Sequence, residues 1–164
     1  MSRPLRAPFA LTVIAVISLV SAGIAADKPF DPCSLLTPAE IQAVVGKPVK
    51  PGTPKIQSNP LAGANCTYVV GDFGSFNVLV KPLQSGETPA VIKAQFAKMK
   101  MNPIDLAGVG DAAFFTSPGY GMVQLHAFKA SKYILFTLLV PGLEEAAVRP
   151  MAGKLMRLVV SRIK

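Results

Sequence analysis

Few residues in this chain of 164 have side chains suited to catalysis or metal binding: two cysteines, Cys33 and Cys66, and one histidine, His126. A catalytic thiol needs a nearby base, but His126 lies in an alternating strand pattern, where a packed or surface histidine is more common than a catalytic one. A zinc site needs about four ligands, and two cysteines with one histidine fall short unless carboxylates join them. The sequence therefore predicts no catalytic, cofactor-binding or metal-binding residue.

The glycine-containing stretch "GVGDAAFF", residues 108–115, is the feature most similar to an enzyme motif. It precedes a predicted strand and lacks the G-K-[ST] element of a phosphate-binding loop. We interpret it as a turn in which Gly108 and Gly110 take positive φ and Asp111 hydrogen-bonds the turn backbone. Serine-hydrolase, zinc-protease and paired-carboxylate patterns do not occur in the sequence, so we expect a protein that is not an enzyme.

Residues 1–25 have the three parts of a secretory signal peptide: a positive start, an apolar run over residues 9–20, and small residues before the cut. Cleavage is predicted after Ala25, with Ala26 as the alternative. An uncleaved membrane anchor is the competing interpretation, because residues 7–26 form an uncharged run about as long as a bilayer is thick. The strongly apolar part is shorter than that, which favours cleavage and a periplasmic or secreted protein.

Export narrows the interpretation of Cys33. A lipid-anchored cysteine must be the first residue after cleavage, but "FDP" precedes Cys33 and the apolar run ends well before it, so we expect no lipoprotein. An exported chain with two cysteines 33 residues apart is typical of one disulfide, here Cys33–Cys66. Closing such a loop would stabilise the fold by about 3–4 kcal/mol.

The charge distribution bears on the kind of partner. The formal net charge is +8, and loss of Arg3 and Arg6 with the signal peptide lowers it by two to +6. The basic residues are scattered and form no dense run interleaved with aromatics, so no nucleic acid is expected as a partner. A weak contact with an anionic membrane surface and a merely soluble basic surface both fit the surplus. An envelope protein or a small ligand is the expected partner, and the sequence does not indicate an oligomeric state.

Helix signals occur in three segments. Thr37 and Glu40 form a capping box before the first helix, and Gly46 ends it. Thr88 and Pro89 open the second in the same way. Apolar stripes are predicted to be buried at Ile41, Val44 and Val45 in the first, Ile92, Phe96 and Met99 in the second, and Val148, Ala152, Leu155 and Val159 in a third.

The third helix follows Glu144 and Glu145, which lie favourably at its positive N-terminus. Pro150 falls inside it and is expected to kink the helix or to divide it in two.

Strand patterns complete the predicted fold. A Pro- and Gly-rich loop with at most a short edge strand near Val49 or Ile56 follows the first helix. The order α-ββ-α-βββ-α predicts an α+β fold, a single domain over residues 26–164 in which an antiparallel sheet carries helices packed on it. Both halves begin with "TPA" and a helix, which hints at two related halves. The strands are predicted at Cys66–Val70, Ser75–Pro82, Ala112–Thr116, Met122–Phe128 and Tyr133–Val140.

Three short motifs, "DPCSLLT", "NCTY" and "LAGVGDAAFF", resemble a family of uncharacterised exported proteins, best known as actinobacterial lipoproteins with a domain of unknown function. The likeness lies in the D-P-C-x-L-L-T start, a second cysteine followed by an aromatic residue, and a G-x-G-D-x-A turn. The resemblance implies an exported domain with a cysteine pair, here Cys33 and Cys66, and it implies no activity. This chain differs from the family in lacking a lipobox, which favours a soluble periplasmic or secreted form.

The leading hypothesis is an exported, non-catalytic binding or accessory domain of the cell envelope, without a cofactor. The alternative is a periplasmic carrier of a small apolar ligand or lipid, bound between the sheet and the helices. Flexible thioethers could line such a pocket, or they could simply fill the core, at Met99, Met101, Met122, Met151 and Met156.

Overall fold

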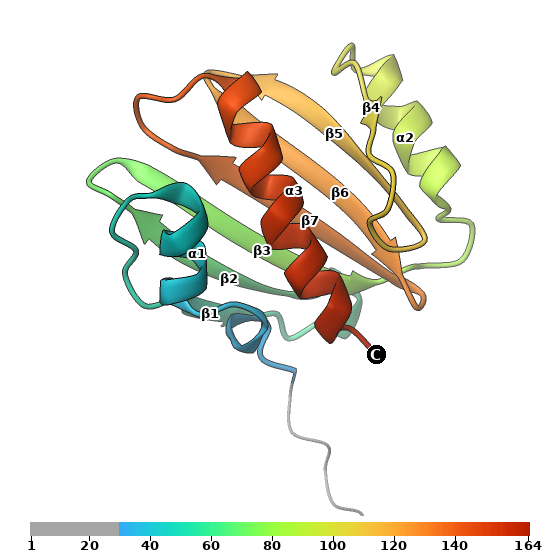
Figure 1. Cartoon of the computed structure of the whole chain (residues 1–164). Helices are drawn as coiled ribbons and strands as arrows, with labels where there is room; N and C mark the ends of the chain where they lie inside the picture. Colours follow the sequence, from blue (N-terminus) through green and yellow to red (C-terminus); the bar gives the residue numbers. More distant parts are fainter. Residues whose placement is uncertain (1–29) are drawn as a thin grey trace, which may run out of the picture.

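A computed structural model describes residues 30–164, so the predicted signal peptide and its cleavage site lie outside the described residues. The described chain folds into one antiparallel sheet with helices on both faces (Figure 1). The helices are α1 (Pro38–Val45), α2 (Pro89–Lys98) and α3 (Glu145–Arg162), with short 3₁₀ turns η1 (Pro32–Leu35) and η2 (Pro60–Ala62). The strands are β1 (Thr53–Ile56), β2 (Ala64–Val70), β3 (Gly74–Pro82), β4 (Ile104–Asp105), β5 (Ala112–Gly119), β6 (Met122–Lys129) and β7 (Lys132–Leu139).

The predicted α+β class is confirmed, and so are the five predicted strands, with ends shifted by a few residues. The structure adds two edge strands. β1 is the short edge strand expected near Ile56, and β4 has two residues, too few to show an alternating pattern. None of the helices in residues 30–164 combines the length and the apolar character needed to cross a membrane.

The strand order β1-β2-β3-β7-β6-β5-β4 is symmetric about β7. All pairings are antiparallel, so β1, β3, β4 and β6 run one way and β2, β5 and β7 run the other. The helices that open the two halves, α1 and α2, pack on opposite faces. Two units of one helix and three strands, related by a two-fold axis along β7, would give this arrangement. That the two halves are related by duplication stays a prediction. The β2–β3 and β5–β6 hairpins nevertheless occupy corresponding positions on either side of β7.

The larger core lies between one face of the sheet and the helices α1 and α3 (Figure 1). The predicted stripe of α3 is fully buried there, at Val148, Ala152, Leu155 and Val159. α3 is continuous from Glu145 to Arg162, so of the two expected effects of Pro150, division of the helix is wrong. Pro150 is the sixth residue of the helix, and its missing N–H removes only one bond, to a carbonyl of the first turn.

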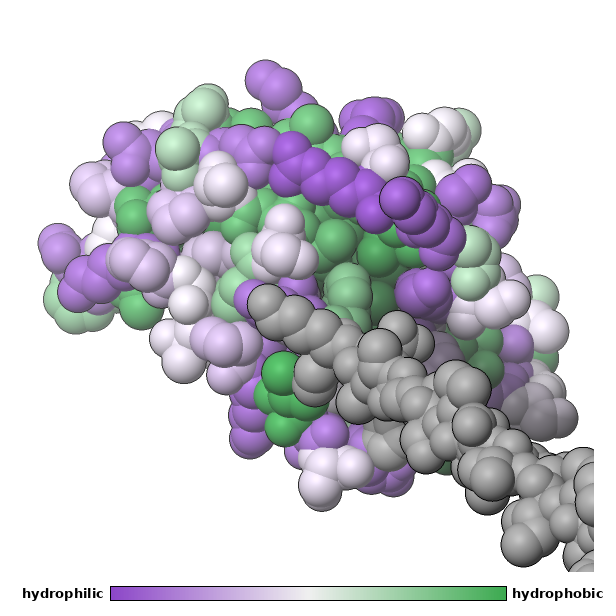
Figure 2. All heavy atoms as spheres, turned by 90° about the horizontal axis from the view of Figure 1, so that it is seen from below, coloured by the Kyte–Doolittle hydropathy of each residue, from purple (hydrophilic) through white to green (hydrophobic). Residues whose placement is uncertain are grey.

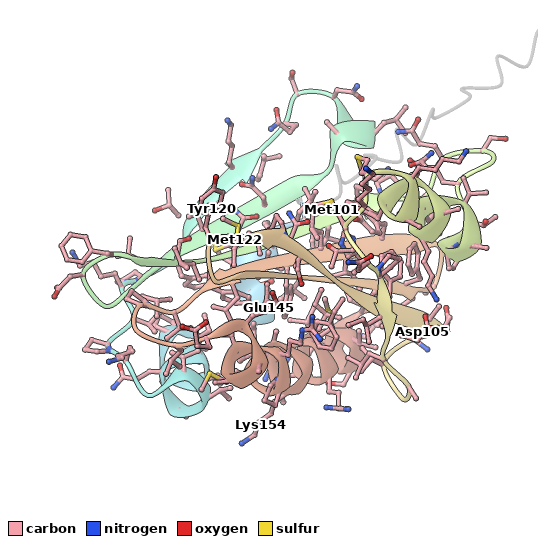
Figure 3. The ribbon with its side chains drawn as sticks, turned by 90° about the horizontal axis from the view of Figure 1, so that it is seen from above. Met101, Asp105, Tyr120, Met122, Glu145 and Lys154 are labelled. Atoms are coloured by element: carbon pink, nitrogen blue, oxygen red, sulfur yellow. A yellow bond between two sulfur atoms is a disulfide. The ribbon has the colours of Figure 1, made fainter. Side chains whose placement is uncertain are left out.

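The smaller core lies on the opposite face, beneath α2 (Figure 3). Ile92 is buried there against Phe114 and Phe128, and Phe96 is partly buried. Met99 is 58% exposed, so its predicted place in the buried stripe is wrong. The helix ends at Lys98, and Met99 is its C-cap residue.

Cys33 and Cys66 form the predicted disulfide, with a Cα–Cα distance of 5.1 Å. The bond joins η1, just before α1, to the middle of β2. The Tyr68 hydroxyl strengthens the same junction by donating to the carbonyl of Leu36 at 2.6 Å. Gly52 passes so close that a Cβ there would lie 2.4 Å from the Cys66 Sγ, which explains the glycine. The long loop between α1 and β2 is thereby fixed against the sheet.

The first and last helices are joined by Arg162. Its guanidinium donates to the Leu35 carbonyl and to the Glu40 carboxylate, while Glu40 also accepts from the Thr37 N–H as part of the predicted capping box. The hydrogen bond from Arg162 is the main reason that the pKa of Glu40 is lowered to about 2. One carboxylate thus caps α1 and attaches it to α3.

We expect that removing the disulfide, as Cys33→Ala with Cys66→Ala, lowers the free energy of unfolding by about 3–4 kcal/mol, because the unfolded chain regains the freedom of a closed loop. Urea denaturation with and without reductant measures this. Wild type should lose stability on reduction, whereas the double variant should not respond to reductant. Equal stability of oxidised and reduced wild type would contradict the expectation.

Candidate functional site

His126 is fully buried in the middle of β6, on the face covered by α2. Both ring nitrogens have hydroxyl partners: Tyr133 Oη lies 2.6 Å from Nδ1, and Thr116 Oγ1 lies 2.8 Å from Nε2. Phe114 stacks on the ring at a centroid distance of 4.6 Å, and Phe96 of α2 lies 4.4 Å away. The packed histidine considered from the sequence is therefore what the structure contains.

A hydroxyl next to a histidine can act as a nucleophile with its base, but this pair is closed to substrate. Thr116 is almost completely buried, and Phe96 covers the imidazole from the side of α2. Burial also lowers the pKa of His126 to about 4, because a charged imidazolium would lose its hydration. The cluster therefore serves packing, and its polar atoms are satisfied within the core.

The "GVGDAAFF" segment forms the turn before β5, as predicted. Gly108 and Gly110 have φ of 71° and 60°. A Cβ on Gly110 would lie 2.3 Å from the Phe128 carbonyl oxygen, so the turn touches the neighbouring strand directly. Asp111 accepts a hydrogen bond from the Ala130 N–H in the β6–β7 turn, rather than from its own turn. Within residues 30–164 no group of three or more His, Cys, Asp or Glu side chains is arranged to hold a metal ion.

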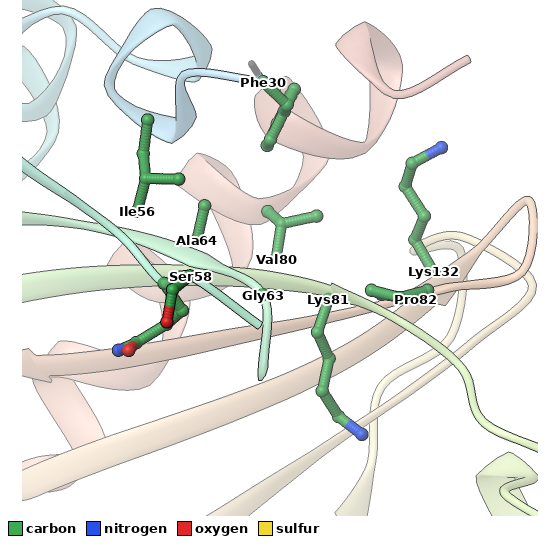
Figure 4. Close-up of a pocket in the computed structure, with 10 residues that line it drawn as sticks. Phe30, Ile56, Ser58, Gly63, Ala64, Val80, Lys81, Pro82 and Lys132 are labelled. Carbon is green, nitrogen blue, oxygen red and sulfur yellow. The ribbon is translucent and has the colours of Figure 1, made fainter. Parts of the chain in front are cut away.

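An apolar cleft lies at the end of the sheet where β2 begins and β3 ends (Figure 4). Its volume is about 310 Å³. We name it the Phe30 cleft. Seen from below, hydrophobic side chains gather in a hollowed region flanked by hydrophilic ones (Figure 2). The cleft is lined by Phe30, Ile56, Gln57, Ser58, Gly63, Ala64, Val80, Lys81, Pro82 and Lys132.

The apolar side chains that form the cleft come from separate parts of the chain. Ile56 ends β1, Ala64 and Val80 are register partners on β2 and β3, and Phe30 approaches from the start of the described chain. In Figure 4 these four side chains point toward one another. Phe30 and Ile56 are 44% and 53% exposed, so an apolar ligand could cover a substantial area on them.

Two lysines border the Phe30 cleft, in different roles. The Lys81 side chain leaves toward the opposite face, where its Nζ pairs with Glu87 at 2.7 Å (Figure 4). Lys132 stays at the rim, and its Nζ donates to the main-chain oxygen of Lys164 at 3.3 Å. Among the described residues, no Asp or Glu side chain lies within ion-pair distance of Lys132. The Lys132 ammonium therefore lies beside an apolar surface, with the main-chain oxygen of Lys164 as its partner.

The methionines do not form the pocket considered from the sequence. Met156 is fully buried in the core under α3, and Met151 packs at the edge of that core. Met101 and Met122 belong to different parts of the α2 side, the first after α2 and the second at the start of β6 (Figure 3). None of them, nor Met99, lines the Phe30 cleft. Core filling and surface positions account for them.

Sequence reasoning missed the Phe30 cleft because its residues form no local pattern. Ile56 gave only a weak signal, as an aliphatic residue in a loop rich in Pro, Gly and polar residues. The pairings of β1 with β2 and of β3 with β7, which bring its neighbours in the cleft together, were not predicted.

We expect the free energy of unfolding to fall by about 3 kcal/mol between pH 6.5 and pH 4, because the unfolded chain protonates His126 in this window and the folded chain does not. Above about pH 7.5 the imidazole is neutral in both states and contributes no slope. The carboxylates with lowered pKa, such as Glu40, add losses below about pH 5.5.

His126 is the one histidine in the chain, so its imidazole resonance can be followed by NMR without assignment. It should not titrate above pH 5 in the folded protein, and His126→Gln should abolish the slope above about pH 5.5. A titration near 6.5 in the folded state would contradict the burial argument.

No protein-family model matches the chain, and neither the curated proteins nor the solved structures include a match. The resemblance drawn from the three short motifs therefore stays a prediction. What can be said of function comes from the chemistry of the Phe30 cleft and of the surface.

Proposed function

We propose that this chain is an exported, non-catalytic binding domain of the cell envelope, and that the Phe30 cleft holds the apolar part of a small ligand. The observation that carries the proposal is the cleft itself, whose lining is almost entirely apolar. Small-molecule sites are typically concave, mostly apolar and equipped with a few polar groups, and volumes begin near 300 Å³. A cleft of about 310 Å³ is suited to a short chain or a single ring.

The disposition of polar groups favours binding over catalysis. The polar side chains that line the cleft are Gln57, Ser58 and the two lysines. None of these lies beside His126, which is enclosed in the other core. A cleft with an apolar wall and no base next to a nucleophile can hold a molecule without transforming it.

The charge at the rim favours an anionic headgroup. Lys132 has no carboxylate side chain as a partner within the described residues, and it lies next to Pro82 at the edge of the apolar wall. The ligand class that fits both features is a medium-chain carboxylic acid or a similar amphipathic anion. Its chain would cover Phe30 and Ile56, and its headgroup would meet Lys132.

Titration of the ¹⁵N-labelled protein with decanoate tests the apolar wall. We expect amide shifts confined to the cleft, and at least ten-fold weaker binding for Ile56→Asp, because a carboxylate would be desolvated against the ligand chain. Val91→Asp is the matched control, since Val91 is exposed to a similar extent on α2. Equal affinity of Ile56→Asp and wild type would refute the assignment of the cleft.

A second titration tests the headgroup. Lys132→Gln should weaken decanoate by about three- to ten-fold, the loss of one exposed ion pair, and should leave decanol unaffected. Equal losses for acid and alcohol would show that Lys132 acts through packing and not through its charge.

A further inference from the structure

Two aromatic side chains protrude from the end of the sheet opposite the Phe30 cleft. Phe73 lies in the turn between β2 and β3 and is 87% exposed, and Tyr120 lies in the turn between β5 and β6 and is 96% exposed. Aromatic side chains so exposed bury almost none of their apolar area in this fold. Their presence at these two positions is therefore not explained by folding.

The backbone conformation at position 120 makes a tyrosine there unfavourable for stability. Gly119, Tyr120 and Gly121 all have positive φ, at 96°, 57° and 71°. Hairpin turns of this kind favour Gly, Asn or Asp, and a bulky aromatic residue with positive φ is uncommon. A residue that costs stability in its own turn and packs on nothing is a candidate for contact with something outside the chain.

The two tips lie at the same end of the sheet and at equivalent places. Val70 pairs with Gly74 and Gly119 with Met122, while Ser75 pairs with Leu139 at the same end of β7. The hairpins occupy equivalent positions on either side of β7. Three strand spacings separate them, about 14 Å. We call the surface that carries Phe73 and Tyr120 the aromatic end.

The charges beside Phe73 favour an anionic surface. Lys47, Lys50 and Asp72 line a shallow hollow together with Phe73 and Pro141. This tip thus carries two ammonium groups and one carboxylate, a net charge of +1.

The charges near Tyr120 leave one net negative charge. Glu144 is exposed at the start of α3, and Glu145 is paired with Arg149. The net positive charge is therefore confined to the Phe73 tip, and this is where the aromatic end would meet anionic headgroups.

We propose that the aromatic end is a docking surface for a lipid bilayer that contains anionic phospholipid. Two protruding aromatics on separate rigid hairpins fit a flat partner, and aromatic residues favour the water–membrane interface. Lys47 and Lys50 would reach the headgroups beside Phe73, helped by the positive net charge of the chain. The Phe30 cleft, at the other end of the strands, would face away from the membrane. This inference does not depend on the proposed ligand.

Flotation of the processed full chain with vesicles tests the proposal. The vesicles are phosphatidylcholine, either pure or containing 30% phosphatidylglycerol, and we expect the wild type to bind the second kind. Phe73→Ser with Tyr120→Ser should weaken partitioning at least ten-fold. Lys47→Glu with Lys50→Glu should weaken binding to the anionic vesicles only. Ile104→Ser is the matched control, because Ile104 is 46% exposed on the edge strand β4. Thermal melting should confirm that the exposed substitutions leave the fold intact.

The chain has no tryptophan, which allows a second, local readout. The emission of Tyr120→Trp should shift to the blue and be quenched by brominated lipid when anionic vesicles are added, while that of Ile104→Trp should not change. Absence of wild-type flotation with either vesicle, or equal partitioning of the double serine variant and wild type, would overturn the proposal. Either result would direct the search for a partner of this surface to proteins.

Discussion

Burial of one side of the sheet beneath α3 is the interaction on which the rest of the structure depends. Strands β2, β3, β5, β6 and β7 contribute apolar residues to this core, and α3 contributes a stripe of fully buried side chains. At 18 residues the helix is about 27 Å long, comparable to the strands it covers. Because α3 takes most of this face, α1 is left the margin beside β2, and α2 must pack on the opposite side.

The two faces have different chemistry as a consequence. The α3 side is almost wholly apolar, so nothing there needs a polar partner apart from the Tyr68 hydroxyl. The α2 side contains a polar chain in which Gln124, Thr116, His126 and Tyr133 satisfy one another. Lys81 lies over the ring of Tyr133 and pairs with Glu87 at the edge. The hydrogen-bonded members lie on β5, β6 and β7, so the network joins these strands, and Phe96 of α2 packs on the His126 ring at its centre.

Most features that could be predicted from the sequence are those that depend on residues close together in the chain. Thr37 and Thr88 cap their helices as predicted, because a cap is a contact between residues three apart. The five longer strands follow from alternation, and the disulfide follows from the count of cysteines. β4 was out of reach because two residues show no period. The Phe30 cleft was out of reach because Ile56, Val80 and Lys132 meet only through the strand pairing. Phe73 and Tyr120 did carry a local signal, an aromatic residue next to glycine in a turn, whose meaning depends on exposure.

The contact between Arg162 and the start of the fold has a consequence for how the protein matures. Its guanidinium reaches Leu35 and Glu40, residues 127 and 122 positions earlier. A chain that emerges from a translocon N-terminus first would present the apolar side of α1 long before α3 arrives to cover it. The cysteines are only 33 positions apart and can be oxidised in this interval. In such a chain the N-terminal residues would need chaperone binding for the longest time. Oxidation of the two cysteines would restrict the conformations that these residues sample before α3 arrives.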